Sequence, residues 1–571
     1  MRRTVVAALA FVFVGAAPSA ADACGGFFCS NVPVDQAGEN ILFVLDEGRV
    51  TAHIQIAYQG AAEDFSWVVP VSAVPEIDVG TDEVFDVLAM QTTPQAWARW
   101  EGVDCDEGYY GYGGWGGDAD SDADAASSGG GDDSGPPPVR IVSAGTVGPF
   151  ETIVVDSSDP EALGWWLRDN GYDVPATADP IVASYVKMGW YFVGLKLRKG
   201  EEAGALQPIV LRMDSDEACV PLRLTAIAAV EDMPVHVWFL ADGRVVPLGW
   251  LEVEPNDARM HGFRWEPLDW GALVGEAADE VGGRAFATDF AGSACPLIPY
   301  LDSGRQCPDA FRDLDTAQEV MDELARQGFR SSGTLLEILE ANVPVPGDME
   351  PSDYYNCPTC YGSGGDVDGE GLARDLERRI VGPVRDVADA MARRPWLTAL
   401  STRVSPSEMT EDPRFAVNRS LGTREPVREA TVFEHCAGTA EFEDDVEEIV
   451  TEAGHHYCAP SEADAPLTSV PAAQRALRWR GEGEPEVVVD RTAEIDEALA
   501  DLYACDGPAP AIETESWTEA PPAQCDPPAR APRCPPRFRS CAAAPGGGGT
   551  PATGALGAWL ALALCGGRRR G

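Results

Sequence analysis

Acidic residues in the middle of the chain have the spacing of a calcium-binding loop. Acids occupy the first, third, fifth and twelfth positions of this loop, and glycine the sixth: Asp366, Asp368, Glu370, Glu377 and Gly371. An EF-hand loop places oxygen ligands and a glycine at these positions. However, a Gly-rich segment precedes the loop instead of a helix, and the fifth position holds a long Glu. We therefore favour a plain acidic helix start, stabilised by the helix dipole, and keep calcium as the one cofactor that the sequence suggests.

Cys357 and Cys360 have the C-x-x-C spacing of a redox dithiol or of half a zinc site. No βαβ pattern surrounds them, and no second pair follows at regular spacing. We expect a structural disulfide, because the leader described below places the chain outside the reducing cytosol.

Further zinc ligands could come from the histidines and cysteines of a later stretch: His435, Cys436, His455, His456 and Cys458. This stretch is acidic and predicted to be loop-rich, so we favour exposed polar residues over ligands. His53 lies on a predicted strand, where a strand-surface or hydrogen-bonded histidine is the expected role.

The compact catalytic motifs are missing from the chain. It contains no G-x-S-x-G elbow, no H-E-x-x-H, no phosphate loop and no dinucleotide fingerprint. A site assembled from distant loops stays open as an alternative, because catalytic geometry is defined in space.

The chain is strongly acidic, with 42 Lys and Arg against 93 Asp and Glu and a formal charge of -51. Nucleic-acid binding depends on neutralising phosphates with Lys and Arg, so this class of partner is excluded. The charge favours solubility outside the cell, with divalent cations or basic partners as the alternative. A Tyr and Trp cluster lies within a low-complexity tract (Tyr109, Tyr110, Tyr112 and Trp115). We favour a plain low-complexity loop, with surface protein or glycan partners as the alternative.

The first 23 residues predict a secretory signal peptide, with Arg2 and Arg3 before an apolar run and small residues at the end. Cleavage before Cys24 would expose a cysteine that either carries a lipid or forms a small disulfide loop with Cys29. The 15 cysteines of the chain agree with disulfide formation after export.

The last thirty residues form a composite signal. Cys541 is followed by Pro-Gly, a glycine run, an apolar segment at 555–564 that contains no charge, and an arginine cluster at 568–570. The apolar segment is shorter than the roughly 20 residues of a comfortable membrane span. This order resembles the MYXO-CTERM tail of myxobacterial surface proteins, which implies processing near Cys541 and membrane-anchored display at the outer surface. Cys565, which follows the apolar run, departs from the pattern.

Short β-branched and aromatic runs between turn residues predict strands, the first three of them in an antiparallel meander. The predicted strands are 41–45, 50–58, 65–71, 191–198, 208–213, 220–230, 234–240 and 245–253. Capping residues and helical periodicity predict helices. These begin at Thr81 or span 159–171, 179–189, 315–327, 334–340, 371–381, 384–394 and 492–503.

Strands interrupted by helical pairs predict an α+β fold: an antiparallel β-rich domain with helical insertions, a mainly helical later portion and a disordered Pro-rich stalk. The predicted organisation is a signal peptide at 1–23, a β-rich part at 24–268 with a Gly/Asp-rich insertion at 104–138, and a mainly helical part at 269–435. It continues with an acidic Cys- and His-containing region at 436–505, a Pro/Gly-rich stalk at 506–550 and the tail at 541–571.

Several short sequence motifs resemble those of a bacterial family known as domain of unknown function 2330 (DUF2330). They are CGGFFC at 24–29, PVDQ-x-GENI at 33–41, T-x-H-IQI-x-Y at 51–58, WVVPV at 67–71, YFVGLKL at 191–197, LQPIVLR at 206–212, CVPLRLTAIAA at 219–229, VEPN-x-AR at 253–259 and RPWLTALSTRVSPSEMTEDPRF at 394–415. The resemblance runs from Cys24 to about Phe433, and it implies no activity. We therefore expect an exported, surface-anchored protein that binds partners or supports the envelope, with an exported, metal-assisted hydrolase as the alternative.

Overall fold

The computed structural model describes residues 35–59, 65–102, 139–172, 174–198, 207–261, 269–301, 304–347, 349–362, 364–435, 446–460, 467–512 and 524–525. By their contacts, the chain divides into units at 1–531 and 532–571, and all described residues belong to the first unit. The described helices include none long and apolar enough to cross a membrane.

An antiparallel hairpin starts the central sheet. Strand β1 (Asp35–Asp46) pairs with β2 (Arg49–Gln59), and Gly48 takes the left-handed conformation (φ 73°) that the tight turn requires. Alternate residues of β1 point to opposite faces, so Ile41 and Phe43 enter one core and Leu42 and Val44 another. This strand is hydrophobic without alternation because both of its faces are covered.

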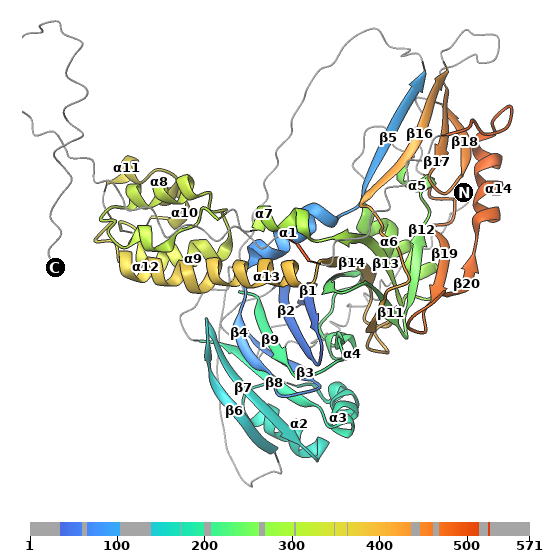
Figure 1. Cartoon of the computed structure of the whole chain (residues 1–571). Coiled ribbons are helices and arrows are strands. Elements are labelled where there is room, and N and C mark those ends of the chain that lie inside the picture. Colours follow the sequence, from blue (N-terminus) through green and yellow to red (C-terminus); the bar gives the residue numbers. More distant parts are fainter. Residues whose placement is uncertain are drawn as a thin grey trace, which may run out of the picture. The chain divides into compact units, whose positions relative to one another are not determined.

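Ten strands form the central sheet, in the order β20-β19-β12-β13-β14-β10-β1-β2-β9-β4 (Figure 1). Its other strands are β4 (Glu76–Val79), β9 (Ile209–Met213), β10 (Met233–Ala241), β12 (Leu251–Pro255), β13 (Ala285–Ser293), β14 (Trp396–Val404), β19 (Ala473–Arg478) and β20 (Glu486–Asp490). The pairs β1 with β10 and β12 with β13 are parallel, and the remaining neighbours in this sheet are antiparallel.

Three smaller sheets accompany the central one. The first has the order β3-β8-β7-β6, the second β18-β17-β16-β5, and the third is the pair β11-β15. Their strands are β3 (Ser66–Val71), β5 (Gln95–Gly102), β6 (Val139–Val147), β7 (Phe150–Ser157), β8 (Tyr191–Leu197), β11 (Arg244–Leu248), β15 (Arg414–Asn418), β16 (Val427–His435), β17 (Val446–Thr451) and β18 (His456–Pro460).

Helices cover the sheets and form a separate cluster. The helices in the first 301 residues are α1 (Asp82–Thr92), α2 (Pro160–Asp169), η2 (Ala176–Ala178), α3 (Asp179–Met188), α4 (Leu222–Thr225), α5 (Ala258–His261), α6 (Trp270–Glu280), η3 (Cys295–Leu297) and α7 (Ile298–Leu301). The later ones are η4 (Pro308–Phe311), α8 (Ala317–Gln327), α9 (Gly333–Asn342), α10 (Pro351–Asn356), α11 (Pro358–Tyr361), α12 (Gly369–Leu376), η5 (Glu377–Val381), α13 (Gly382–Arg393) and α14 (Thr492–Tyr503).

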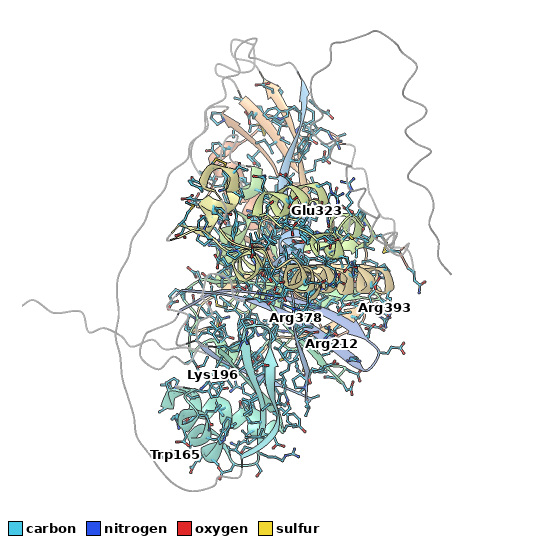
Figure 2. The ribbon with its side chains drawn as sticks, turned by 90° about the vertical axis from the view of Figure 1, so that its left-hand side faces the viewer. Trp165, Lys196, Arg212, Glu323, Arg378 and Arg393 are labelled. Carbon is cyan, nitrogen blue, oxygen red and sulfur yellow. A yellow bond between two sulfur atoms is a disulfide. The ribbon has the colours of Figure 1, made fainter. Side chains whose placement is uncertain are left out.

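Each face of the central sheet has its own core. On one face, side chains of β1, β2 and β10 pack with those of β3, β7 and β8. On the other, β1 and β10 pack against α1, α7 and α13, which lie beside the sheet in Figure 1. Helices α8, α9, α10 and α12 share a third core of their own. Arg212 of β9, labelled in Figure 2, pairs with Asp78 of the neighbouring strand β4 and with Asp386 of α13, and the second ion pair links the sheet to a helix.

The predicted fold class is confirmed: the protein is α+β, with mostly antiparallel sheets and helices concentrated between α6 and α13. The helical pair with Pro at the first turn and Gly at the end is present as α2 and α3, closed by Gly171 and Gly189. Of the stalk range, the structure describes 506–512 and 524–525. Within it, Cys525 is disulfide-bonded to Cys295.

Two predictions about the strands are wrong. The third strand of the expected meander, β3, pairs with β8 in another sheet, because its two faces serve different cores: Val69 packs with β1 and β2, and Val68 with α2 and α3. The predicted strand at 220–230 contains the short helix α4. Its leucines are buried against two different cores, which one flat strand would not achieve.

Strands from the ranges 24–268, 269–435 and 436–505 pair with one another. Strand β14 pairs with β10, β19 with β12, and β16 with β5. The three ranges thus contribute strands to common sheets, although they differ in composition. The stretch predicted to be loop-rich after 435 contains β17 to β20 as well as the expected helix at 492–503.

Gly194, at the centre of β8, lies against the ring of Tyr172. A Cβ at this position would lie 2.5 Å from Tyr172 Oη and 2.9 Å from Ile153 Cγ2. We expect Gly194→Ala to lower the free energy of unfolding by about 1–3 kcal/mol, the usual cost of overpacking, as measured by urea denaturation. Gly145→Ala in β6 is the matched control, since its nearest neighbour would lie 3.9 Å away. Equal stability of the two variants would contradict the close packing.

Candidate functional site

A polar pocket of about 330 Å³ lies where the central sheet meets the four-stranded sheet that contains β16. Strands β12, β19 and β20 supply one part of its wall, and α5, α6, β16 and the turn after β17 supply the rest. Its charged residues are Glu254, Asp257, Arg424, Arg428, Glu452, Arg475 and Asp490. The volume is suited to a small molecule.

Arg428 forms the inner wall of the pocket. Its side chain is buried and donates hydrogen bonds to the backbone carbonyls of Thr288 and Asp289, at 3.2 and 2.9 Å. The guanidinium also lies over the Trp270 ring, and its Nε has no hydrogen-bond partner in the described protein. Burial lowers the pKa of Arg428 to about 9. A nearly buried cation with a spare donor is suited to an anionic group.

Asp289 lies buried behind Trp270. Its Oδ1 accepts hydrogen bonds from Trp270 Nε1 and Ser401 Oγ, both at 2.7 Å. Burial raises the pKa of Asp289 to about 7, although these hydrogen bonds and Arg428 act in the opposite direction. The hydrogen bond from the indole fixes the orientation of Trp270 in the pocket wall.

Arg424 presents a second guanidinium to the pocket. Its backbone is held by two hydrogen bonds with Ala291, at 2.7 and 2.8 Å. Its side chain has no ion pair with any residue that the structure describes. Glu452, on another side of the pocket, likewise forms no ion pair with a Lys or Arg of the described ranges, although its charge acts on Arg428 to raise the pKa of that residue. The pocket therefore offers one cationic and one anionic group to a ligand.

Asp257 connects the pocket to a buried histidine. Asp257 Oδ2 accepts a hydrogen bond from the Ala453 backbone at 2.8 Å, and its Oδ1 lies 3.9 Å from His455 Nε2. His455 Nδ1 contacts Asp496 Oδ1 at 2.6 Å, and the imidazole is completely buried. Burial raises the pKa of Asp257. This Asp, His and Asp series could move a proton toward the pocket, because carboxyl and imidazole groups are the usual acids and bases of proteins.

Three of the four predicted calcium ligands have other contacts within the described structure. Asp368 caps α12 by accepting a hydrogen bond from Gly371 N at 2.9 Å. Glu370 pairs with Arg312, and Glu377 with Arg385 at 2.7 Å. Asp366 lies exposed before the helix. An acidic helix start is thus present, and calcium binding by these residues stays a prediction.

Only some of the remaining predicted residues lie in the part of the chain that the structure describes. Cys357 and Cys360 form the disulfide that the sequence favoured. Cys24, Cys29 and Cys541 lie outside the described residues, as do the signal peptide, the insertion tract and the tail. His53 is buried in β2, and burial lowers its pKa to about 4.

The structure separates the later histidines. His435 and His456 both contact Glu448, whereas His455 is buried between Asp257 of the pocket wall and Asp496. Cys458 is disulfide-bonded to Cys505.

Sequence reasoning missed most of the pocket. Arg424, Arg428 and Glu452 carry no local motif, and no spacing along the chain relates them. One sequence motif did point to the pocket, because VEPN-x-AR at 253–259 contains Glu254, Pro255 and Asp257 of the pocket wall.

The fold and the pocket define an α+β protein with a charged pocket at the junction of two sheets. The family model described as an uncharacterized protein conserved in bacteria (DUF2330) matches residues 18–282, and this part of the chain belongs to that family. Neither a curated protein nor a solved structure matches the chain. The matched region holds Glu254, Asp257 and Trp270, while all three pocket arginines come from the later chain.

The raised pKa of Asp289 predicts a pH dependence of stability. Between about pH 4 and 7 the folded protein holds a proton that the unfolded chain has released, so stability falls as the pH rises. One such proton contributes a slope of up to about 1.4 kcal/mol per pH unit. Asp289→Asn keeps the Oδ1 acceptor but cannot titrate, and we expect a shallower slope in urea unfolding curves over this range.

The control for this experiment is Asp313→Asn, at an exposed position. Glu39 and Glu83, whose pKa values burial also raises to about 7, remain in all three proteins, so the difference isolates Asp289. Identical slopes for Asp289→Asn and the unchanged protein would contradict the interpretation.

Proposed function

We propose that this chain is an exported, surface-displayed protein that binds a small acidic carbohydrate in the pocket at Arg424 and Arg428. The single observation that carries the proposal is the placement of three guanidinium groups and four carboxyl groups around one cavity, with Arg424 and Glu452 free of ion pairs to the described residues. Arginine binds a carboxylate through paired N–H donors. Asp257 and Glu452 can accept hydrogen bonds from hydroxyl groups of the same ligand.

Export and display have support from the two ends of the sequence and from the cysteines. The leader at 1–23 predicts secretion, and the order of features after Cys541 resembles a surface-sorting tail. Disulfides link Cys295 with Cys525 and Cys458 with Cys505. Such bonds persist in oxidising compartments, which agrees with a location outside the cytosol.

Binding is favoured over catalysis by the composition of the pocket. Its lining, within the described chain, includes no serine or cysteine that could act as a nucleophile. The second candidate, an exported hydrolase, is favoured by one observation: the contact series from Asp257 through His455 to Asp496 could activate water. Release of product from a bound saccharide would distinguish this candidate from simple binding.

The binding proposal predicts a specific effect of Arg424. We expect the purified mature protein to bind glucuronic acid more tightly than glucose in isothermal titration calorimetry. Arg424→Gln should weaken the binding of glucuronic acid about tenfold or more, because a hydrogen bond to a charged group contributes about 1.5–3 kcal/mol. The control is Arg419→Gln, which removes an exposed arginine paired with Asp242 and Glu482. Equal affinity for both sugars, or unchanged affinity in Arg424→Gln, would contradict the proposal.

The display proposal is tested in cells with the full chain. We expect Cys541→Ala to reduce labelling of the protein at the cell surface by an impermeant reagent, because processing near this cysteine would be lost. Cys565→Ala is the matched control within the same tail and should leave surface labelling unchanged. Surface labelling that does not depend on Cys541 would contradict anchoring through this residue.

A further inference from the structure

A second polar pocket, of about 210 Å³, lies beside helix α1, and we call it the α1 pocket. Glu83 and Val87 of α1 are one helical turn apart, so both face this space. The rest of the wall includes Arg305 and Gln306, from the loop after α7, and Arg330, which follows α8. Helix α7 itself lies next to α1 (Figure 1). The described walls of the α1 pocket and of the pocket between the two sheets have no residue in common.

Glu83 brings an unpartnered carboxyl group to the α1 pocket. The residue is only 4 % exposed, and its Oε1 accepts no hydrogen bond from the described protein. Burial raises the pKa of Glu83 to about 7, the charge of Arg330 acts in the opposite direction, and the charges of Asp86 and Asp82 raise the pKa further. Arg330 forms no ion pair with this carboxyl group. A buried carboxyl group of this kind is suited to a ligand that brings a positive charge.

Hydrogen bonds of Gln327 hold the two arginines at the same pocket. Its Oε1 accepts a hydrogen bond from the Cys307 backbone N–H at 2.5 Å, and its Nε2 donates one to the Cys307 carbonyl at 3.2 Å. The loop that carries Arg305 is thereby fixed against the end of α8, where Gly328 closes the helix in the left-handed conformation (φ 74°) just before Arg330. Neither arginine forms an ion pair with a residue of the described ranges. The α1 pocket therefore offers two guanidinium groups to a ligand.

We propose that the α1 pocket binds a free α-amino acid with a short aliphatic side chain. The ligand carboxylate binds Arg305 and Arg330, because guanidinium groups pair with carboxylates through parallel N–H donors. The ligand ammonium binds Glu83 and supplies the positive charge that this carboxyl group lacks. A simple anion would leave Glu83 unpartnered, and a simple amine would leave the arginines unpartnered. An α-amino acid carries both charges within one small molecule.

The size and the apolar part of the wall define the side chain of the ligand. Val87 and Leu301 line the pocket and belong to the core between α1, α7 and α13. The volume is below the 300–1,000 Å³ that is typical of sites for drug-sized ligands. A side chain of the size of that of valine satisfies both conditions. This inference does not depend on carbohydrate binding at Arg424, because the two pockets are separate.

The test compares valine with two analogues that each lack one charge. We expect the purified mature protein to bind L-valine in isothermal titration calorimetry. The analogues are 3-methylbutanoate, which lacks the amino group, and 2-methylpropylamine, which lacks the carboxylate. Both should bind at least about tenfold more weakly, because each loses one charge-assisted pairing. The absence of valine binding would overturn the site, and equal binding of 3-methylbutanoate would overturn the role of Glu83.

Variants assign the binding to this pocket. Arg330→Gln and Glu83→Gln should each weaken the binding of valine about tenfold or more. Glu83→Gln keeps the shape of the protonated acid, so we expect it to fold, and thermal unfolding of each variant checks this. The control is Arg378→Gln, at an exposed arginine without an ion pair in the described ranges, and it should bind valine normally. Unchanged affinity in both folded pocket variants would overturn the proposal.

Proton release gives an independent measurement of the contact between the ammonium and Glu83. Since the pKa of Glu83 is about 7, about half of the free chains hold its proton at pH 7. A bound ammonium favours the ionised form, so binding should release up to about half a proton, measured by titration in buffers of different ionisation enthalpy. The ionisable groups that face Glu83 are Asp82 and Asp86 on its own helix, Tyr300 of α7 and the two arginines. All of them remain in Glu83→Gln, which should release fewer protons, and equal release by the two proteins would contradict the contact.

Discussion

Backbone pairing of β10 with both β1 and β14 is the constraint on which the rest of the structure depends. The parallel partner β1 comes from the start of the described chain, and the antiparallel partner β14 from more than 150 residues after β10. Because the sheet is covered on both faces, β10 supplies Val237 and Phe239 to one core and Trp238 and Leu240 to the other. Buried backbone groups on these strands must all be paired, so the strand order cannot shift without exposing one of the two cores.

This order also determines where chemistry can occur. Once β12, β13 and β14 are aligned in the central sheet, Asp289 lies beside Ser401 and Trp270, and the backbone of Ala291 holds Arg424. The pocket forms at the junction of two sheets, where strand ends leave a space that side chains do not fill. Its charged groups are expensive to bury singly, and most are paired or hydrogen-bonded. Arg424 and Glu452 are the exceptions in the described pocket wall, which is why a ligand is the natural counterpart for them.

Local features of the sequence could be predicted where neighbouring residues decide the structure. Pro at the first turn and Gly at the end defined α2 and α3, and the hairpin of β1 and β2 followed from hydrophobic runs around a glycine turn. The position of β3 could not be predicted, since nothing within its six residues indicates a partner more than 100 residues away. The histidines show the same limit: His435 and His456 were recognised as ligand types, but only strand register places them beside Glu448. No sequence motif marked the pocket arginines, because their partners come from four separate stretches of chain.

The disulfide between Cys295 and Cys525 encloses 230 residues of sequence. A pulling force applied to the chain beyond Cys525 would pass through this covalent bond to Cys295, which lies between β13 and α7 beside the core. The segment between the two cysteines, including β14 to β20 and the pocket arginines, would carry none of the tension. The hydrogen bonds of its strands would therefore be protected from mechanical rupture, and the pocket would keep its geometry while the C-terminal end of the molecule is under load.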